Sequence, residues 1–264
     1  DQRVSMTILL LALTNIAMLA ALALILHKVR RLHIAMFEVS DKLNDIHHES
    51  RELYGQIQAY VDLVRLLRIE TPLPRLRGWA ASPDFLLLVA KHALRSKPNT
   101  IFECSSGAST VVLARCAQLN GVGHVYSLEH DPHFADITRQ SLADAGVAEW
   151  ATVIDAPLTP EPALGGQLWY ATSAIPNIED IDMLVIDGPP ESTAPLARFP
   201  ALPALAPRFA ARCDIFADDA DRPAERAMIE RWKQDDGEAL DIEAAFIPAE
   251  KGCAHLVVRR RDTA

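Results

Sequence analysis

The hydrophobic pattern begins with a long uncharged run at residues 6–26, in which only Thr7, Thr14 and Asn15 are polar. As an α-helix, which rises 1.5 Å per residue, this run is about 30 Å long and matches the hydrocarbon thickness of a bilayer. We therefore predict a transmembrane anchor over residues 1–27. A buried core helix is disfavoured, because the run has no polar face.

The charges beside this run predict its orientation. Lys28, Arg30 and Arg31 follow it, whereas only Arg3 precedes it. Positively charged flanks stay in the cytoplasm, so we expect a single span in the inner (cytoplasmic) membrane with the rest of the chain on the cytoplasmic side. A cleaved signal peptide is the main alternative, since residues 21–23 (Ala-Leu-Ala) resemble a cleavage site.

A heptad repeat follows the apolar run. Its positions alternate at spacings of three and four, and Ser50 is the only polar residue among them. Such a repeat favours a coiled-coil stalk over residues 28–71 and a homo-oligomer joined through residues 29–67. An amphipathic helix packed on the chain's own globular domain is the alternative. Prolines at 72 and 74 are expected to end the helix. The repeat consists of Val29, Leu32, Met36, Val39, Leu43, Ile46, Ser50, Leu53, Ile57, Tyr60, Val64 and Leu67.

From residue 72 onward, short apolar runs alternate with amphipathic stretches. Ser82, Pro83 and Asp84 mark the start of a helix that runs to about Ser96. We predict further helices at 109–119, 132–145, 194–210 and 223–234, and strands at 100–104, 124–128, 151–155, 181–187, 213–217, 240–246 and 254–259. This order predicts an α/β fold with a seven-stranded, mostly parallel sheet and helices on both faces. The last two strands have no helix between them and should form an antiparallel hairpin.

Charge distinguishes the two parts of the chain. Residues 1–81 carry a net charge of +2, and residues 82–264 carry −11. An acidic main domain argues against a nucleic-acid substrate, because phosphate binding relies on clustered Lys and Arg. The four cysteines are scattered and contain no CxxC pair. They fit a reducing compartment better than a disulfide framework or a zinc site.

Carboxylates recur where the predicted strands end, which is where parallel sheets bind ligands. Glu103 precedes a turn of small residues that opens a helix, and a helix amino terminus favours an anionic group. Glu129 follows Gly107 by 22 residues, a spacing at which an acid accepts hydrogen bonds from ribose hydroxyl groups. Singly, each acid is as often a helix cap as a ligand contact. Later strands end in Asp155, Asp187 and the pair Asp218 and Asp219.

These segments resemble the class I S-adenosylmethionine (SAM)-dependent methyltransferases over about residues 79–260. The resemblance rests on residues 103–109, 127–131, 155 and 187–190 in that order. It implies a Rossmann-like domain, here residues 72–264, with SAM as its cofactor. The implied cofactor-binding residues are Glu103, Ser105, Ser106, Gly107, Ser109, Glu129, His130, Asp155, Ala156 and Asp187.

The resemblance also implies where each part of SAM binds. Residues 105–109 would wrap its methionine end, and Glu129 would hold the ribose. Asp155 and Ala156 would border the adenine, whose pocket His130 would line, while Asp187 would lie beside the sulfonium. Ser105 departs from the family pattern, because a glycine usually opens this loop. Serine fits the turn if its φ is negative.

Asp187, Asp218 and Asp219 are similar to the metal-binding acids of the catechol and sugar O-methyltransferases. This similarity implies a Mg²⁺ ion on the three carboxylates, with Asp187 and Asp218 as catalytic residues. In the alternative, Asp219 and Asp221 cap the helix after residue 223, and Asp187 contacts SAM alone. The lysine that acts as a base in the catechol enzymes is missing here. Four histidines are the other candidate bases, although surface or packing roles are typical of lone histidines: His92, His130, His133 and His255.

The expected function is a membrane-anchored enzyme that moves a methyl group from SAM to a hydroxyl acceptor. A small molecule, a saccharide or a lipid-linked glycan would suit a membrane tether, but the sequence does not identify the acceptor. One alternative is an NAD-dependent Rossmann enzyme, whose glycine fingerprint and Tyr-x-x-x-Lys motif are missing. Another is a non-catalytic scaffold displayed on an oligomeric stalk.

Overall fold

The computed structural model describes residues 2–76, 78, 80–235 and 239–261. In its first helix, the side chains of residues 2–5, 7–9, 12, 44–49 and 51 are not described, so Thr7 and the heptad residue Ile46 lie outside the described side chains. The chain divides into two compact units, Asp1–Tyr54 and Gly55–Ala264. The second unit therefore begins before residue 72, where the sequence suggested a boundary.

The first unit consists of the greater part of helix α1 (Gln2–Leu67). All side chains described between residues 6 and 43 are exposed. The segment Leu13–Leu43 is long and apolar enough to cross a membrane by length and composition, a test that a signal sequence also passes. A long apolar helix is thus present where the sequence predicts the anchor.

The last turns of α1 belong to the second unit and pack on it. Their heptad residues Ile57 and Tyr60 are exposed, at 54% and 39%. The helix ends at Leu67, where Arg68 takes a left-handed backbone with a φ of 49°. In this segment the helix does pack on its own domain, and Leu67 of the heptad seam is buried there, whereas Ile57 and Tyr60 stay uncovered. The packed face consists of Gln56, Ala59, Leu63 and Leu67.

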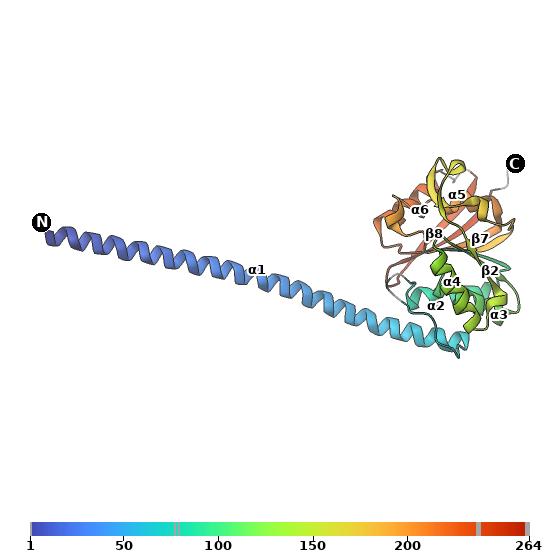
Figure 1. Ribbon diagram of the computed structural model, residues 1–264, viewed down its shortest axis with the longest axis horizontal. Helices are drawn as coiled ribbons and strands as arrows, with labels where there is room; N and C mark the ends of the chain where they lie inside the picture. Colours follow the sequence, from blue (N-terminus) through green and yellow to red (C-terminus); the bar gives the residue numbers. More distant parts are fainter. Residues whose placement is uncertain (1, 77, 79, 236–238, 262–264) are drawn as a thin grey trace. The chain divides into compact units, whose positions relative to one another are not determined.

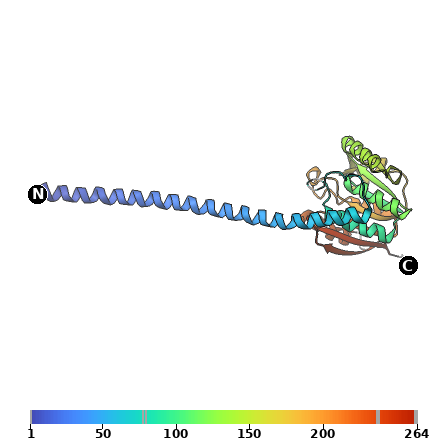
Figure 2. The same cartoon turned by 90° about the horizontal axis from the view of Figure 1, so that it is seen from below.

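A seven-stranded sheet forms the centre of the second unit, in the order β3-β2-β1-β6-β7-β9-β8. The first five strands of this order are parallel, whereas β9 runs antiparallel to both β7 and β8. Figure 2 shows β8 and β9 in red at one edge of the sheet. The predicted sheet and its closing hairpin are confirmed. The strands are β1 (Thr100–Cys104), β2 (His124–Glu129), β3 (Ala151–Asp155), β6 (Ile181–Ile186), β7 (Phe209–Asp218), β8 (Leu240–Ile247) and β9 (Cys253–Arg260).

Helices cover both faces of this sheet (Figure 1). One face packs against α2 (Pro83–Ser96), α3 (Ala108–Asn120) and α4 (Pro132–Asp144), and the other against α5 (Ala201–Leu205) and α6 (Pro223–Asp235). Consecutive strand residues alternate between the two cores: Ile101 and Val185 belong to the first, Phe102 and Ile186 to the second. Because the central strands are buried on both sides, most of their residues are apolar.

Two segments differ from the predicted elements. The prediction of a helix over 194–210 is wrong beyond Ala201–Leu205, since prolines at 195, 200, 203 and 207 interrupt it and β7 already begins at Phe209. The sequence also gave no sign of an antiparallel hairpin formed by β4 (Leu158–Glu161) and β5 (Gln167–Tyr170). Its strands are too short for a clear period-two pattern. Short 3₁₀ turns lie at Ala148–Trp150, Pro162–Leu164, Thr172–Ala174, Glu191–Thr193 and Ala206–Arg208.

Candidate functional site

The carboxyl ends of four parallel strands meet at one edge of the sheet. Cys104 at the end of β1 pairs in register with Leu128 of β2 and with Ile186 of β6, and Ile186 pairs with Ala217 of β7. The residues that follow these positions therefore gather at the same edge, which is where ligands bind in parallel sheets. They include the predicted site segments 105–109, 129–131, 187–190 and 218–219.

A short loop joins β1 to α3, and the side chain of Glu103 in β1 contacts the residues that follow this loop. Glu103 is fully buried and accepts a hydrogen bond from the hydroxyl of Thr110 in the first turn of α3. That hydroxyl also accepts from the Gly107 N–H (3.0 Å). Burial raises the pKa of Glu103 to about 7, although hydrogen bonds from Ser109, Thr110 and Ser127 oppose the shift. Glu103 thus holds the loop in place from within the core.

Ser105 takes an unusual backbone conformation at the start of this loop. Its φ is +86°, so the negative φ at which serine would fit this turn is not adopted. A residue with a side chain in this region is strained by roughly 1–3 kcal/mol. Two hydrogen bonds hold the turn: Ser105 N donates to Leu128 O (3.1 Å), and Ser127 Oγ donates to Ser105 O (3.0 Å).

Gly188 packs closely against Ser105 from the neighbouring strand end. A Cβ atom at position 188 would lie 2.6 Å from the Ser105 Cβ and 2.7 Å from the Tyr170 hydroxyl. Both distances are well below van der Waals contact. Only glycine therefore fits at position 188 while serine and tyrosine occupy the other two positions.

Glu129, the predicted ribose ligand, is buried and fully engaged in the protein. Its Oε2 accepts from the backbone N–H (3.1 Å) and the hydroxyl (3.0 Å) of Ser106. Its Oε1 accepts from the backbone N–H groups of His130 (2.8 Å) and Asp131 (3.1 Å). The carboxylate thus ties the loop after β1 to the loop after β2. A ribose hydroxyl group would have to share or replace the contacts of Ser106.

His130 and Tyr170 lie beside Glu129. The His130 Nδ1 is 3.0 Å from Glu129 Oε1, and its ring lies 6.3 Å from the ring of Tyr170. Tyr170, on the unpredicted hairpin, is fully buried, and its hydroxyl has no hydrogen-bond partner among the described residues. A buried hydroxyl without a partner costs on the order of 1–3 kcal/mol. A bound ligand that pairs with it would remove this cost.

Asp155 and Ala156 extend the same edge past β3. The Ala156 N–H donates to the backbone oxygen of Glu129 (2.7 Å), which places Ala156 next to the predicted ribose ligand. The Asp155 carboxylate instead pairs with Arg139 of α4 (2.7 Å), and its side chain is 56% exposed. Asp155 therefore lies at the rim of the edge.

Three carboxylates gather where β6 and β7 end. One oxygen from each of Asp187, Asp218 and Asp219 lies within 4.8 Å of the others. Asp218 and Asp219 are buried, and the Asp187 side chain is 13% exposed. The Oδ2 atom of Asp219 faces the guanidinium groups of Arg198 (2.7 Å) and Arg222 (3.0 Å). The side chain of Asp219 therefore points into the cluster that the sequence predicted.

Arg198 is the cation at the centre of this cluster, and its side chain is 5% exposed. Besides Asp219, it lies 3.4 Å from Asp187 Oδ1 and donates to the backbone oxygens of Asp187 (3.0 Å) and Asp218 (3.1 Å). Glu225 of α6 lies 3.9 Å away. A buried arginine held by this many partners is fixed in position.

Negative charge remains in excess around Arg198. Four carboxylates, those of Asp187, Asp218, Asp219 and Glu225, surround two guanidinium groups, which leaves an excess of two. Burial and the neighbouring carboxylates raise the pKa of Asp187 to about 8 and that of Asp218 to about 6, although Arg198 and Lys251 oppose both shifts. Protons therefore neutralise part of this charge near pH 7.

The cluster also offers oxygen atoms that fit a divalent cation. Both carboxylate oxygens of Asp218 and the Oδ1 of Asp219 are buried without a hydrogen-bond partner among the described residues. Carboxylate oxygens are the ligands that Mg²⁺ prefers, and one such ion would neutralise the excess charge in place of the protons. The donor set thus fits the metal that the sequence predicts, and the metal itself stays a prediction.

Sequence reasoning missed two residues of this edge, Arg198 and Tyr170. Arg198 is the only charged residue between positions 194 and 207. A single charge in an otherwise apolar stretch indicates burial with a partner of opposite charge, and this signal was available. Tyr170 had no comparable signal, because its position depends on the hairpin of β4 and β5.

Comparison with known proteins gives a family and a fold. Residues 104–220 match the profile of a family described as a methyltransferase domain. No curated protein matches the chain.

Several solved structures have the same fold. An O-methyltransferase from Bacillus cereus in complex with S-adenosylhomocysteine (SAH) is 16% identical with a TM-score of 0.56, covering 80% of this chain and 97% of that one. The O-methyltransferase TomG from Streptomyces achromogenes, in complex with SAM, is 17% identical with a TM-score of 0.51, covering 80% and 96%. An SAH-bound methyltransferase from Podospora anserina is 15% identical with a TM-score of 0.51, covering 77% and 88%. The predicted Rossmann-like methyltransferase fold is thereby confirmed.

Proposed function

We propose that this chain, whose residues 104–220 match a methyltransferase-domain family, is a class I SAM-dependent methyltransferase that transfers the methyl group of SAM to a hydroxyl acceptor at a membrane. One observation carries the proposal. The loop after β1, the buried Glu129 and the cluster of three aspartates all lie at the same edge of the sheet.

SAM would lie across the ends of β1 and β2. Its methionine end would face residues 105–109, where the amino terminus of α3 favours a carboxylate. Its ribose would bind Glu129 in place of the Ser106 hydroxyl, and its adenine would lie near His130, Ala156 and Asp155. The unpartnered hydroxyl of Tyr170 is a further group with which SAM would pair.

The acceptor hydroxyl would approach the cluster of aspartates, next to the sulfonium of SAM at Asp187. A divalent cation such as Mg²⁺ on Asp187, Asp218 and Asp219 would lower the pKa of that hydroxyl group. Arg198 orients Asp187 and Asp219 through its ion pairs. Without a bound cation, the pKa of Asp218 is raised to about 6, which would suit this carboxylate to take up the proton near neutral pH.

The amino-terminal helix would hold the enzyme at its acceptor. The apolar run at residues 6–26 would span the inner membrane, with the catalytic unit on the cytoplasmic side. The heptad positions from 29 to 67 would join copies of the chain. A tethered enzyme would favour acceptors made in or at the membrane, such as a lipid-linked glycan or a small lipid-soluble molecule.

Calorimetric titration of the full-length protein in detergent tests the cofactor. We expect SAM to bind and NAD to give no more heat than buffer. Glu129→Ala should weaken SAM binding by about 1–3 kcal/mol, because the ribose hydroxyl groups lose their acceptor. Glu149→Ala removes an exposed acid elsewhere and is the matched control.

Circular dichroism must show that the Glu129 variant is folded, since Glu129 also holds Ser106. Unchanged SAM affinity in a folded Glu129→Ala protein would remove the ribose assignment. Failure of the wild-type protein to bind either SAM or NAD would favour the non-catalytic scaffold.

Methyl transfer from labelled SAM to membrane lipid and glycan extracts tests the reaction. With the metal in place, EDTA should abolish transfer, and Mg²⁺ should restore it. Asp218→Asn should be inactive while binding SAM like the wild type, whereas Asp221→Asn, at an exposed neighbour, should stay active. Activity that survives thorough chelation would exclude the metal and leave Asp187 or Asp218 as the base.

A further inference from the structure

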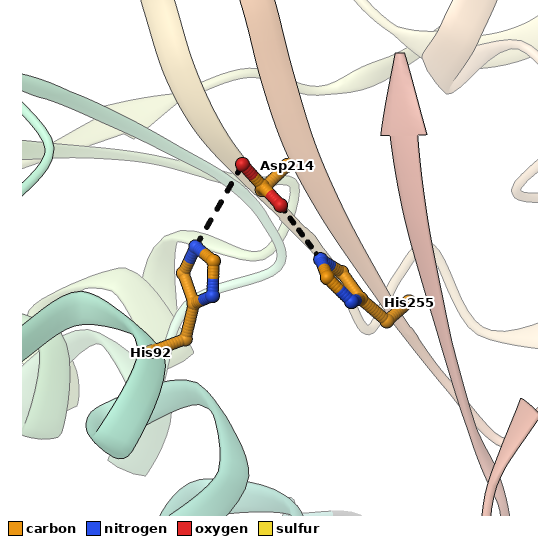
Figure 3. Close-up of side chains that lie close together, drawn as sticks. All are labelled: His92, Asp214 and His255. Atoms are coloured by element: carbon orange, nitrogen blue, oxygen red, sulfur yellow. Dashed lines mark hydrogen bonds and ion pairs between the residues drawn. The ribbon is translucent and has the colours of Figure 1, made fainter. Parts of the chain in front are cut away.

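A second cluster of ligand-type side chains lies away from the candidate cofactor site (Figure 3). His92 of α2, Asp214 of β7 and His255 of β9 each offer one nitrogen or oxygen atom, and these atoms lie within 4.8 Å of one another. The Nε2 atom of His255 is 2.7 Å from Asp214 Oδ1, and that of His92 is 3.9 Å from Asp214 Oδ2. Each histidine thus faces a different oxygen of the same carboxylate.

This cluster lies between α2 and the sheet, toward the edge opposite the three aspartates Asp187, Asp218 and Asp219. Asp214 precedes Asp218 by four strand residues, which corresponds to about 13 Å along β7. A cleft of about 580 Å³ adjoins it, lined by His92 and Asp214 together with residues such as Asn99, Asp182 and Ala210. Asn99 precedes β1, while Asp182 and Ala210 lie near the starts of β6 and β7. The cleft therefore opens at the amino ends of the strands.

Packing fixes both imidazole rings. The ring of His255 stacks on Phe216 at 4.5 Å with an angle of 9° between the planes, and His92 meets Phe216 edge-on at 4.9 Å. Rings held in this way need little rearrangement to bind an ion.

The distances suit a small cation with tetrahedral coordination. Bonds of about 2.0–2.1 Å from Zn²⁺ to nitrogen or oxygen, at a tetrahedral angle, hold two donor atoms about 3.3 Å apart. The two nitrogen-to-oxygen distances, 2.7 Å from His255 to Oδ1 and 3.9 Å from His92 to Oδ2, involve different oxygens of Asp214, and one ligand atom of each residue lies within 4.8 Å of the others. Side-chain shifts that bring both histidine nitrogens toward one oxygen of Asp214 would complete the geometry.

Arg212 is the group with which a cation would compete. Its guanidinium forms two hydrogen bonds to Asp214, at 3.0 Å and 3.1 Å, but the arginine side chain is 55% exposed. It can therefore turn into solvent, or keep one oxygen while the ion takes the other, because a carboxylate has about four acceptor sites.

We propose that His92, Asp214 and His255 form a binding site for Zn²⁺ or a similar divalent ion of the first transition row. Two imidazole nitrogens and one carboxylate oxygen are a typical zinc ligand set, and they leave a fourth position for water. The ion would join α2 to the strands β7 and β9. It is separate from the three aspartates, whose all-oxygen donor set suits Mg²⁺.

Zinc titration of the full-length, metal-stripped protein in detergent tests this site. The background is Asp218→Asn, which removes a ligand of the other cluster. We expect one Zn²⁺ per chain and a rise in melting temperature. His92→Ala and His255→Ala should each weaken binding by at least about 100-fold, because a lost ligand costs more than the 10–100-fold of a lost outer contact. His133→Ala, at an exposed histidine of α4, is the matched control and should bind zinc normally.

Cobalt provides a second readout, which the wild-type protein gives by itself. Co²⁺ bound by two histidines and one carboxylate in tetrahedral geometry gives intense visible absorption, whereas an octahedral all-oxygen site gives a weak band. We expect the intense spectrum from the wild-type protein and its loss in folded His92→Ala. The proposal is wrong if the wild-type protein gives only the weak band. It is also wrong if the His92 and His255 variants bind zinc as tightly as the His133 control, in which case the cluster is only a polar network around Asp214.

Discussion

Glu103 is an acid in a position that water does not reach. Burial raises its pKa from 4.5 to about 7, so the folded protein retains a proton that the unfolded chain has already released. Below about pH 4.5 both states are protonated, and this group has no effect on stability. Between pH 4.5 and 7 only the unfolded state ionises, so stability decreases as the pH rises.

Glu103→Gln should remove this dependence, because the amide keeps the shape of the side chain and cannot ionise. A shift of this size corresponds to about 3 kcal/mol. The free energy of unfolding of the variant relative to the wild type should therefore increase by about 3 kcal/mol between pH 4.5 and 7, as measured by urea denaturation. Glu149→Gln, at an exposed position, should show no such change. A constant difference between Glu103→Gln and wild type would contradict the buried acid.

At the candidate site, the sequence predicted the acids but not their surroundings. The spacing of Glu129, Asp187 and Asp218 along the chain was enough to predict that they lie together, because the carboxyl ends of parallel strands meet at the same edge of the sheet. The conformation of Ser105 depends on two hydrogen bonds to β2, which no local pattern reveals. The position of Arg198 depends on an irregular loop whose prolines exclude a helix. Local sequence therefore indicated which groups are present, and tertiary contacts determine how they are paired.

Among the elements, the last turns of α1 combine two different surfaces. One face, which includes Leu63, enters the core of the second unit, whereas Ile57 and Tyr60 remain on the surface. The apolar residues recur every 3.5 residues in a heptad repeat and about every 3.6 residues in a packed amphipathic helix. Over a short segment these periods are nearly the same, so the sequence supported both interpretations. The structure assigns residues 55–67 to the globular unit.

Leu63→Ala should therefore destabilise the globular unit by about 2–5 kcal/mol, because it opens a cavity in a fully buried position. Val61→Ala, on the same turn but 45% exposed, should cost less than about 0.5 kcal/mol. Urea unfolding followed by the fluorescence of the buried Trp169 and Trp232 measures both variants. Equal effects would mean that the helix does not pack on the domain.

Elements with a strong period were predictable, and short or proline-rich ones were not. The strands that begin at Thr100, Ala151 and Ile181 were predicted within one residue at each end, because buried parallel strands form short, mostly apolar runs. The hairpin over Leu158–Glu161 and Gln167–Tyr170 has four residues in each strand, which is too few to establish a period.

For the molecule as a whole, the two units differ in what they expose. The described side chains of the first unit are exposed along its whole helix, including large apolar ones such as Leu32 and Met36. An apolar surface of this length is typical of a helix that contacts lipid or other helices. The apolar run at residues 6–26 predicts contact with lipid, and the heptad repeat that follows it predicts contact with other helices.

Charges placed in the heptad seam should dissociate the predicted oligomer. Leu43→Asp combined with Ile57→Asp would bury two carboxylates between helices, which is strongly unfavourable. Analytical ultracentrifugation in detergent should show an oligomer for the wild type and a monomer for this variant. Gln58→Asp, next to the seam on an exposed position, should remain oligomeric. A monomeric wild-type protein would dispose of the coiled coil.

The close packing of Gly188 against Ser105 and Tyr170 links the evolution of three positions. A side chain at 188 would overlap both neighbours, so position 188 is free to diverge only after positions 105 and 170 have lost volume. Related sequences with a larger residue at 188 should therefore carry glycine at 105 and a side chain shorter than tyrosine at 170. The order of these replacements is also restricted, since the substitution at 188 must come last.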